Sequence, residues 1–392
     1  MSKRIKIAIY SGEIPSSTFI ERLVDGLAQK DHAIYLFGIQ KFGVHYPDNV
    51  RVLGYRTSRV FKIFYLFKYW LLLSLFNSKS KKALDVYLKE QQRFNLYSRL
   101  KTYPVLYHRP DVFHVQWAKG IGEWLWVQDF GMKLVLSLRG AHVNYSPIAD
   151  LQLASMYRTF FPKVDGFHAV SNAIGKESKH YGAPSALIKT VYSGLDLTTF
   201  GFREIKSPRA VLRLLAVGRS HWKKGYGYAL DACYLLKQQG LDFHFTLLGV
   251  QEDFELLYQR RDLRLEEVVN FERAVSGDLV RYYMESADVL LLPSVEEGIA
   301  NVVLEAMAIG TVVIATDCGG MDEVLEDGVN GFLVPVRDPK ALAEKITYVA
   351  GLPQERLEAI RREARKTIET QHRLDLMVEG MSDLYEQLTI NN

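Results

Sequence analysis

The chain has 392 residues, of which 48% are hydrophobic and 24% are charged. This balance excludes a largely disordered or collagen-like protein, and the length predicts two domains, each large enough to bury its own core. Lysine and arginine total 49 against 45 aspartate and glutamate, a net charge of +4, so no overall basic field indicates a nucleic-acid partner.

Localisation can be inferred from two features. The N-terminus leads directly into an apolar, β-branched run without the longer apolar core of a signal peptide. The two cysteines, Cys233 and Cys318, stand in unrelated contexts, which argues against a disulfide scaffold or a zinc site and favours a reducing compartment. We therefore expect a cytoplasmic protein.

The first half of the chain predicts alternating strands and helices. Strand 4–10 stops at Ser11-Gly12-Glu13, a helix follows over 18–30, and a second strand covers 33–37. This order is typical of parallel strands joined by a right-handed crossover. Further strands are predicted at 111–115, 133–138 and 166–170. Residues 1–200 are therefore expected to form one doubly wound α/β domain.

An apolar segment interrupts this series. Residues 61–76 read FKIFYLFKYWLLLSLF, and a lysine-rich stretch to residue 82 follows. The run is too short and too charged to span a bilayer. Two interpretations of residues 61–82 remain open: contact with a membrane surface or a lipid, or a core helix with solvated lysines.

A second series begins near Val211. Strands are predicted at 211–217, 243–248, 268–271, 288–292 and 311–315, with helices at 227–239 and 278–286 between some of them. Residues 199–208 read as a linker, 208–368 as the second domain, and 369–392 as a C-terminal helix that packs back on the first domain. The sequence thus predicts two Rossmann-like domains.

The stretch from Leu292 to Gly310 has the most informative chemistry. A strand ends near Pro293, and a helix is expected to start near Ile299. A helix N-terminus stabilises an anion such as pyrophosphate, and Glu297 and Glu305 could direct two carboxylates at sugar hydroxyls. Alternatively, Glu297 complements the helix dipole and Glu305 is solvated.

A second cluster follows the first strand of the same domain. Gly218-Arg219 and Lys224-Gly225 lie at the carboxyl end of strand 211–217, where ligands bind in open α/β sheets. The two cations could clamp phosphate oxygens while the glycines permit tight turns. Surface Arg and Lys are more often merely solvated, so the pattern alone is weak.

Taken together, these stretches resemble the family 4 retaining glycosyltransferases of the GT-B fold, in which two facing Rossmann-like domains hold a nucleotide sugar in the cleft between them. The resemblance rests on an ordered series of motifs: Gly218-Arg219, Lys224-Gly225, Pro293-Ser294, Glu297 to Glu305 as E-x7-E, Ala306-Met-Ala-x-Gly310, Val313-Ile-Ala-Thr-Asp317, and Gly328-Val-Asn-Gly331-Phe-Leu-Val.

The resemblance implies roles for individual residues. Arg219 and Lys224 would neutralise the donor diphosphate, Glu297 would hold the donor sugar, and Glu305 the ribose. The resemblance further implies that the distal phosphate binds the backbone amides of Gly298, Ile299, Ala300 and Asn301. The nucleobase would lie beside the loop that contains Arg273, Ala274 and Val275. It also implies retention of anomeric configuration without a divalent metal, and the chain contains no Asp-x-Asp sequence.

The first domain departs from the family pattern. Gly12 would approach the diphosphate, but Arg139 stands where many relatives have His, and His142 where they often have Asp. Arg139 could stabilise phosphate and His142 could touch the sugar or the acceptor. His114 and His168, each within a strand, are expected to be core histidines.

The resemblance therefore implies a retaining, metal-independent hexosyltransferase of bacterial polysaccharide or lipopolysaccharide biosynthesis. Its partners would be a nucleotide-sugar donor and a glycan or lipid-linked acceptor, with a peripheral position on the inner membrane face left open. The alternatives are a nucleotide-sugar epimerase or hydrolase of the same fold, or a binding protein without turnover. A dinucleotide-dependent oxidoreductase fits less well because the first βα turn lacks GxGxxG.

Overall fold

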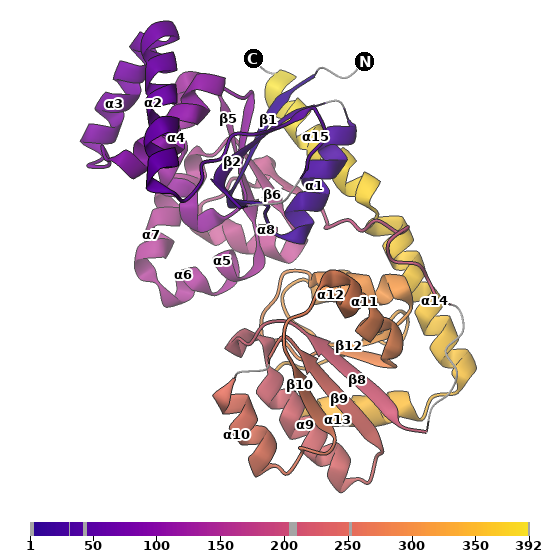
Figure 1. Cartoon of the computed structure of the whole chain (residues 1–392). Helices are drawn as coiled ribbons and strands as arrows, with labels where there is room; N and C mark the ends of the chain where they lie inside the picture. Colours follow the sequence, from indigo (N-terminus) through magenta and orange to yellow (C-terminus); the bar gives the residue numbers. More distant parts are fainter. Residues whose placement is uncertain (1–3, 31, 42–44, 204–209, 251–252, 391–392) are drawn as a thin grey trace. The chain divides into compact units, whose positions relative to one another are not determined.

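The computed structural model describes residues 4–30, 32–41, 45–203, 210–250 and 253–390, and residues 204–208 of the predicted linker lie outside them. The chain forms two compact units (Figure 1). Unit 1 comprises residues 1–170, 174–194 and 374–392, and unit 2 comprises residues 171–173 and 195–373. Each unit is an α/β sandwich around its own sheet.

Unit 1 contains a seven-stranded parallel sheet in the order β3-β2-β1-β4-β5-β6-β7. Its strands are β1 (Lys6–Ile14), β2 (Ala33–Gln40), β3 (Val50–Val52), β4 (Val112–Val115), β5 (Lys133–Leu138), β6 (Gly166–Ala169) and β7 (Ile188–Thr190). Its helices are α1 (Thr18–Gln29), α2 (Arg59–Phe76), α3 (Ser78–Glu90), α4 (Leu96–His108), α5 (Gly140–Asn144), α6 (Ser146–Ala149), α7 (Leu151–Phe160), most of α8 (Asn172–Ser178) and α15 (Leu374–Ile390).

Unit 2 contains a six-stranded parallel sheet in the order β10-β9-β8-β11-β12-β13. Its strands are β8 (Leu212–Val217), β9 (Phe243–Leu248), β10 (Val269–Glu272), β11 (Val289–Leu292), β12 (Val312–Thr316) and β13 (Phe332–Val334). Its helices are α9 (Tyr226–Gln238), α10 (Phe254–Asp262), α11 (Gly277–Ser286), α12 (Asn301–Ile309), α13 (Pro339–Ala350) and α14 (Gln354–Gln371).

Alternation along the strands explains why each sheet is covered on both faces. In β1, Ile7 and Ile9 join a core cluster with residues of α1 and α15, whereas Ala8 faces the opposite cluster. In β12, Val313 packs with α12 residues and Ile314 with the cluster that includes α9 and α13. Parallel strands buried on both faces are typical of doubly wound sheets, and the prediction of two Rossmann-like α/β domains is confirmed.

Two strands run past their predicted ends: β2, predicted over 33–37, continues to Gln40, and β1 is longer as well. Strand β1 does not stop at Ser11 but continues to Ile14, because a bulge at Gly12, where φ is +93°, lets pairing with β2 resume from Gly12 opposite Gly38. Helix α12 begins at Asn301, two residues from the expected start near Ile299, because Ala300 keeps an extended conformation as the N-cap.

Candidate functional site

The loops after β8 and β11 meet at the carboxyl edge of the unit 2 sheet. Strands β8 and β11 are neighbours, and the connections from them run to opposite sides, toward β9 and β12. This is the switch point of a doubly wound sheet, where ligands bind outside the carboxyl ends of the strands. The sequence motifs after these two strands are therefore brought to the position that the topology favours.

Glycine allows the two loops to approach closely. Gly225 follows the short 3₁₀ turn Trp222–Lys224 and has a φ of +66°. A Cβ atom at Gly225 would lie 1.9 Å from the Pro293 carbonyl oxygen. The Val295 amide donates a hydrogen bond of 2.7 Å to the Lys223 carbonyl. Backbone therefore packs directly on backbone, which explains the requirement for glycine at 225.

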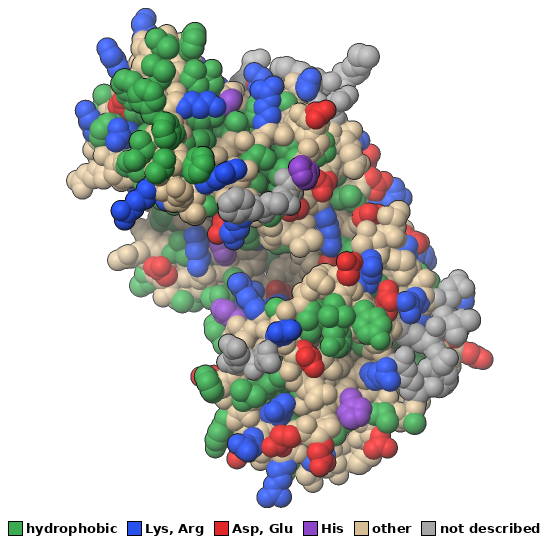
Figure 2. Space-filling model, in the orientation of Figure 1, with side chains coloured by type: hydrophobic (Ala, Val, Ile, Leu, Met, Phe, Trp, Pro, Cys, Tyr) green, Lys and Arg blue, Asp and Glu red, His purple; other side chains and the backbone are tan. Residues whose placement is uncertain are grey.

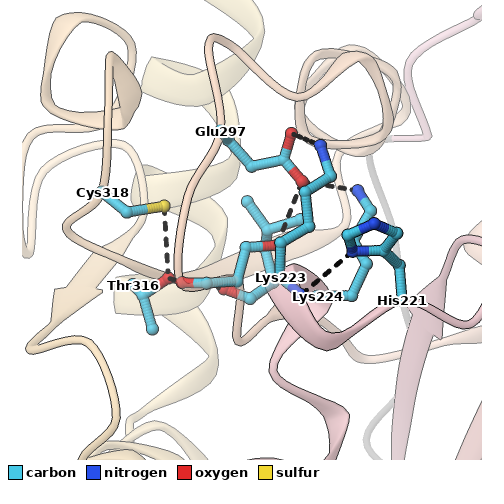
Figure 3. A network of polar contacts seen from close by, with 8 residues as sticks. His221, Lys223, Lys224, Glu297, Thr316 and Cys318 are labelled. Atoms are coloured by element: carbon cyan, nitrogen blue, oxygen red, sulfur yellow. Dashed lines mark hydrogen bonds and ion pairs between the residues drawn. The ribbon is translucent and has the colours of Figure 1, made fainter. Parts of the chain in front are cut away.

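Glu297 is the centre of a buried polar network (Figure 3). Its carboxylate is 2.6 Å from Lys224 Nζ and 3.7 Å from Lys223 Nζ, and it accepts a 3.2 Å hydrogen bond from Ser294 Oγ. Only 8% of Glu297 is exposed. Two ammonium groups thus meet one carboxylate, which leaves a local excess of positive charge where the sequence predicted a phosphate clamp.

Burial and neighbouring charges keep His221, Tyr226 and Cys318, which lie around Glu297, in their neutral forms. Burial, followed by the charges of Lys223, Arg219 and Lys224, lowers the pKa of His221, so this ring is neutral at pH 7. Burial raises the pKa of Tyr226, and Glu297 raises it further. Burial also raises the pKa of the Cys318 thiol to about 12, so it stays protonated. The lysine–glutamate cluster is therefore the charged part of the site.

A third loop supports the network from β12. Thr316 Oγ1 donates hydrogen bonds to the carbonyls of Leu292, at 3.2 Å, and of Ser294. Gly319, with a φ of +60°, packs so closely that a Cβ atom would lie 1.8 Å from the Glu297 carbonyl oxygen. The Gly320 amide donates to the Gly298 carbonyl at 2.9 Å. This loop therefore holds the carbonyl groups of Glu297 and Gly298 in position.

The remaining predicted donor-site residues of unit 2 lie around these loops. Arg219 is exposed and forms no hydrogen bond or ion pair with the described residues. Glu305 is half-buried in the second turn of α12, and Ala300 caps that helix. The segment predicted to contact the nucleobase follows β10, with Arg273 and Ala274 exposed and Val275 half-buried against the core.

Sequence reasoning missed Lys223, Thr316 and the Gly319-Gly320 turn. A signal existed for each of them: Lys223 precedes the predicted Lys224, and Thr316 belongs to the motif from Val313 to Asp317. The glycine pair follows a buried strand whose carboxyl end faces the site. What the sequence did not show was that both lysines reach the same carboxylate.

The other predicted residues belong to unit 1 and are described within it. Gly12 lies in β1, and the space beside its Cα is open, since a Cβ atom there would have no neighbour within 4 Å. Arg139 caps α5, donates a 2.8 Å hydrogen bond to Gln116 Oε1, and lies 4.3 Å from the Phe19 ring centre. Desolvation lowers its pKa to about 9. His142 lies in α5, with its ring centre 5.3 Å from that of Trp117.

His114 and His168 are core histidines, which confirms the expectation. Both are buried, and each ring forms a hydrogen bond with Ser137 Oγ, at 2.8 Å for His114 and 2.9 Å for His168. His114 also contacts Tyr385 Oη of α15 at 2.7 Å, and His168 donates to the Val191 carbonyl at 3.0 Å. Burial lowers the pKa of His168 to about 3 and that of His114 well below its ordinary value, so both rings are neutral and structural.

No metal site emerges from the geometry of the described residues: among them no group of three or more His, Cys, Asp or Glu side chains is placed to hold an ion.

Two family models match the regions of the chain that form the two units. Residues 16–199 match the family model described as Glycosyltransferase Family 4, and residues 212–351 match the one described as Glycosyl transferases group 1. The chain belongs to glycosyltransferase family 4 and has the GT-B fold. The E-x7-E and Gly-Arg motifs of this glycosyltransferase lie within the second matched region.

Curated relatives are similar over part of their length. The putative colanic acid biosynthesis glycosyltransferase WcaL of Salmonella typhimurium is 32% identical over 219 residues, which is 54% of each chain. The amylovoran biosynthesis glycosyltransferase AmsK of Erwinia amylovora is 29% identical over 214 residues, 53% of this chain and 52% of AmsK. The alignments thus span about half the length of these relatives.

Solved structures share the fold over the whole chain. A glycosyltransferase from Rickettsia africae has a TM-score of 0.72 at 17% identity and covers 100% of both chains. HepE from Anabaena, solved in complex with UDP and glucose, has a TM-score of 0.72 at 17% identity and covers 98% of this chain and 100% of its own.

Proposed function

We propose that this glycosyltransferase transfers a sugar from a nucleotide-diphosphate sugar to a glycan or lipid-linked acceptor in the biosynthesis of a bacterial extracellular polysaccharide. The observation that carries the proposal is the Lys223–Lys224–Glu297 cluster at the switch point of the unit 2 sheet. The names of WcaL and AmsK support the pathway class, and the UDP complex of HepE supports the donor class.

The proposed donor site divides the charges of the substrate between its residues. Arg219 and Lys224 bind the diphosphate, and the amides from Gly298 to Asn301 at the start of α12 receive the distal phosphate. Glu297, freed from part of its pairing with lysine when the diphosphate binds, accepts hydrogen bonds from the sugar. Glu305 accepts them from the ribose, and the base lies along Arg273 to Val275.

The proposed chemistry depends on stabilising charge as it develops. When the glycosidic bond breaks, the sugar becomes cationic and the leaving diphosphate gains negative charge. Fixed cations at Arg219, Lys223 and Lys224 stabilise that leaving group without reorganisation, which lowers the barrier. These residues supply the positive charge that a divalent metal would otherwise provide, so we propose metal-independent transfer. The resemblance to retaining glycosyltransferases is the support for the further proposal that configuration is retained.

A donor screen followed by a transfer assay tests the proposal. Purified protein is titrated with UDP-, GDP- and ADP-sugars, and transfer of labelled sugar from the best binder to isolated polysaccharide intermediates is measured with and without EDTA. We expect transfer that EDTA does not affect, and a product whose anomeric configuration, read by NMR, equals that of the donor. If the protein epimerised or hydrolysed the sugar nucleotide at the same rate with and without acceptor, the assignment would be overturned in favour of the alternative enzymes.

Variants connect the activity to the cluster. Lys224→Ala should reduce transfer by about 100-fold or more, as expected when a charged group that stabilises the transition state is removed. Lys345→Ala is the matched control, because Lys345 forms a comparable 3.0 Å pair with Asp327 elsewhere in unit 2. Near-wild-type transfer by Lys224→Ala would contradict the proposed site.

A further inference from the structure

Helix α2 has two apolar faces, of which only one is covered. Tyr69 and Leu73 are buried against unit 1, and Tyr69 Oη contacts His108 Nε2 at 3.0 Å. The Tyr65 hydroxyl, on the same face, donates a hydrogen bond to the Leu53 carbonyl. These contacts fix the orientation of the helix on the domain, so the opposite face is held outward.

The outward face is a continuous stripe of large apolar side chains at helical spacing. Its members, Val60, Phe64, Phe67, Leu71 and Leu75, recur every three or four residues and are 61, 68, 56, 40 and 67% exposed, respectively. Ile63 and Trp70 widen the stripe on one side. A helix that is apolar all round is normally buried all round, and exposed apolar patches of this kind mark interaction sites. Figure 2 shows the green patch over α2 and α3.

Positive charge surrounds this apolar face. Helices α2 and α3 together contain seven lysine and arginine residues and two acidic residues, a net charge of +5, whereas the whole chain has a net charge of only +4. One of the two acids, Asp85, is already paired with Lys81 at 3.0 Å and accepts a 2.6 Å hydrogen bond from Tyr103 Oη. The blue side chains around the green patch in Figure 2 show this arrangement.

We propose that the outward face of α2, with the lysines of α3, docks unit 1 on an anionic lipid bilayer. Phenylalanine, tryptophan and leucine beside lysine are the side chains that favour the interfacial region of a membrane, and a basic cluster is attracted to anionic headgroups. Within the described ranges no helix is both long and apolar enough to cross a membrane, so α2 would lie along the surface.

Charge decides between the bilayer and a second copy of the chain. A symmetric dimer through this face would bring two surfaces of net charge +5 together. An anionic bilayer offers both an apolar layer for the stripe and negative charge for the lysines. Docking through this face does not depend on the identity of the donor or acceptor.

Co-sedimentation with vesicles tests the docking. The full chain should bind vesicles of phosphatidylcholine with phosphatidylglycerol and bind less to phosphatidylcholine alone. The triple variant Phe64→Ser, Phe67→Ser, Leu71→Ser should lose at least about tenfold in partitioning, because three exposed apolar side chains are removed. The control, Phe254→Ser with Tyr258→Ser, removes side chains that are 85 and 73% exposed on α10 of unit 2 and should bind as the wild type does.

Two further measurements separate the contributions. Lys79→Gln with Lys82→Gln should weaken binding to the anionic vesicles by about 25-fold at low salt, about fivefold per lysine, whereas Lys340→Gln with Lys366→Gln in unit 2 should not. Trp70, which is 41% exposed, should be quenched by brominated lipid, and Trp70→Phe should remove that quenching.

The outcomes that overturn the proposal are distinct. Equal vesicle binding by the triple variant and the wild type would overturn it, as would quenching that persists in Trp70→Phe. A concentration-dependent dimer that the triple variant abolishes, with no vesicle binding by the wild type, would assign the face to a second copy instead. Because the substituted side chains lie at the surface, unchanged thermal unfolding should verify that each variant is folded.

Discussion

At the scale of single residues, the site depends on two lysines that share one carboxylate. Lys223 and Lys224 are only 14 and 16% exposed, and the Glu297 side chain between them is 10% exposed. Burying three charges together is costly unless each is paired, so an arrangement with one cation in excess is prepared for an anion that completes it. The donor diphosphate is the anion that we propose.

Lys223 is the residue to test because the sequence did not single it out. It lies farther from Glu297 than Lys224 does, 3.7 Å against 2.6 Å. Lys223→Ala should therefore weaken binding of the donor nucleotide by about tenfold, or roughly 1.4 kcal/mol, and less than Lys224→Ala does. Isothermal titration with UDP or the best nucleotide from the screen measures both. Affinity unchanged by Lys223→Ala would assign the diphosphate to Lys224 and Arg219 alone.

His168 makes the stability of unit 1 depend on pH. Its pKa is about 3 in the folded protein and about 6.5 in an unfolded chain. Between these values the unfolded state binds a proton that the folded state does not. The stability is therefore complete above about pH 6.5 and declines as the pH falls toward 3, by about 1.4 kcal/mol per pH unit, or about 2 kcal/mol at pH 5.

The variant His168→Gln isolates this effect, because its amide can still donate to the Val191 carbonyl and accept from Ser137 Oγ. We expect the free energy of unfolding of unit 1 to fall by about 2 kcal/mol less in the variant than in the wild type between pH 7 and pH 5. Urea unfolding at the two pH values, followed by tryptophan fluorescence, measures the difference. Identical losses would show that the His168 ring is not held neutral.

At the scale of elements, the sequence predicted most strands to within two residues but missed the short ones. Mostly apolar runs such as Lys133–Leu138 and Phe243–Leu248 agree with the structure at both ends. Strands β3, β7 and β13 have three residues each, too few for a period to show. The continuation of β1 past Gly12 was missed because a bulge depends on the partner strand.

The candidate site shows the same division. Gly218, Lys224, Pro293 and Glu297 were identified from motifs, and the topology accounts for their meeting. The third loop could not be found by spacing alone, because its residues act on backbone groups of the other loops: Thr316 donates a hydrogen bond to the Ser294 carbonyl, and Gly319 packs on the Glu297 carbonyl. For α2, the sequence shows apolar residues on most faces of the helix, but it does not show which face packs against the rest of unit 1.

Gly225 tests whether loop packing is what assembles the site. In Gly225→Ala, the added Cβ would meet the Pro293 carbonyl at 1.9 Å and the residue would keep a φ of +66°. We expect a loss of at least about 2 kcal/mol in the stability of unit 2 and weaker nucleotide binding.

Gly240→Ala is the matched control, because Gly240 has a φ of +73° with no atom within 4 Å of the added Cβ. It should cost about 1 kcal/mol and leave nucleotide binding unchanged. Chemical unfolding combined with nucleotide titration measures both variants. Equal effects of the two substitutions on binding would show that contact with Pro293 does not shape the site.

At the scale of the whole molecule, the chain passes from unit 1 to unit 2 at residues 194–195 and returns at 373–374. The return gives unit 1 its last helix, α15, whose Met377, Val378, Met381, Leu384 and Tyr385 join the core cluster that contains α1 and β1 residues. Unit 1 is thus completed by the last segment of the chain, whereas unit 2 consists almost entirely of one continuous stretch. Each unit has its own core clusters.

Separate cores predict separate unfolding transitions. Met381 of α15 and Met307 of α12 are both fully buried, and methionine to alanine in a core costs about 2–5 kcal/mol. In calorimetry, Met381→Ala should lower only the transition of unit 1, and Met307→Ala only that of unit 2. The nucleotide should raise only the unit 2 transition, since a ligand stabilises the state that binds it. If either substitution shifted both transitions equally, the two units would unfold as one cooperative structure. Separate cores would then not be enough to make the units unfold independently.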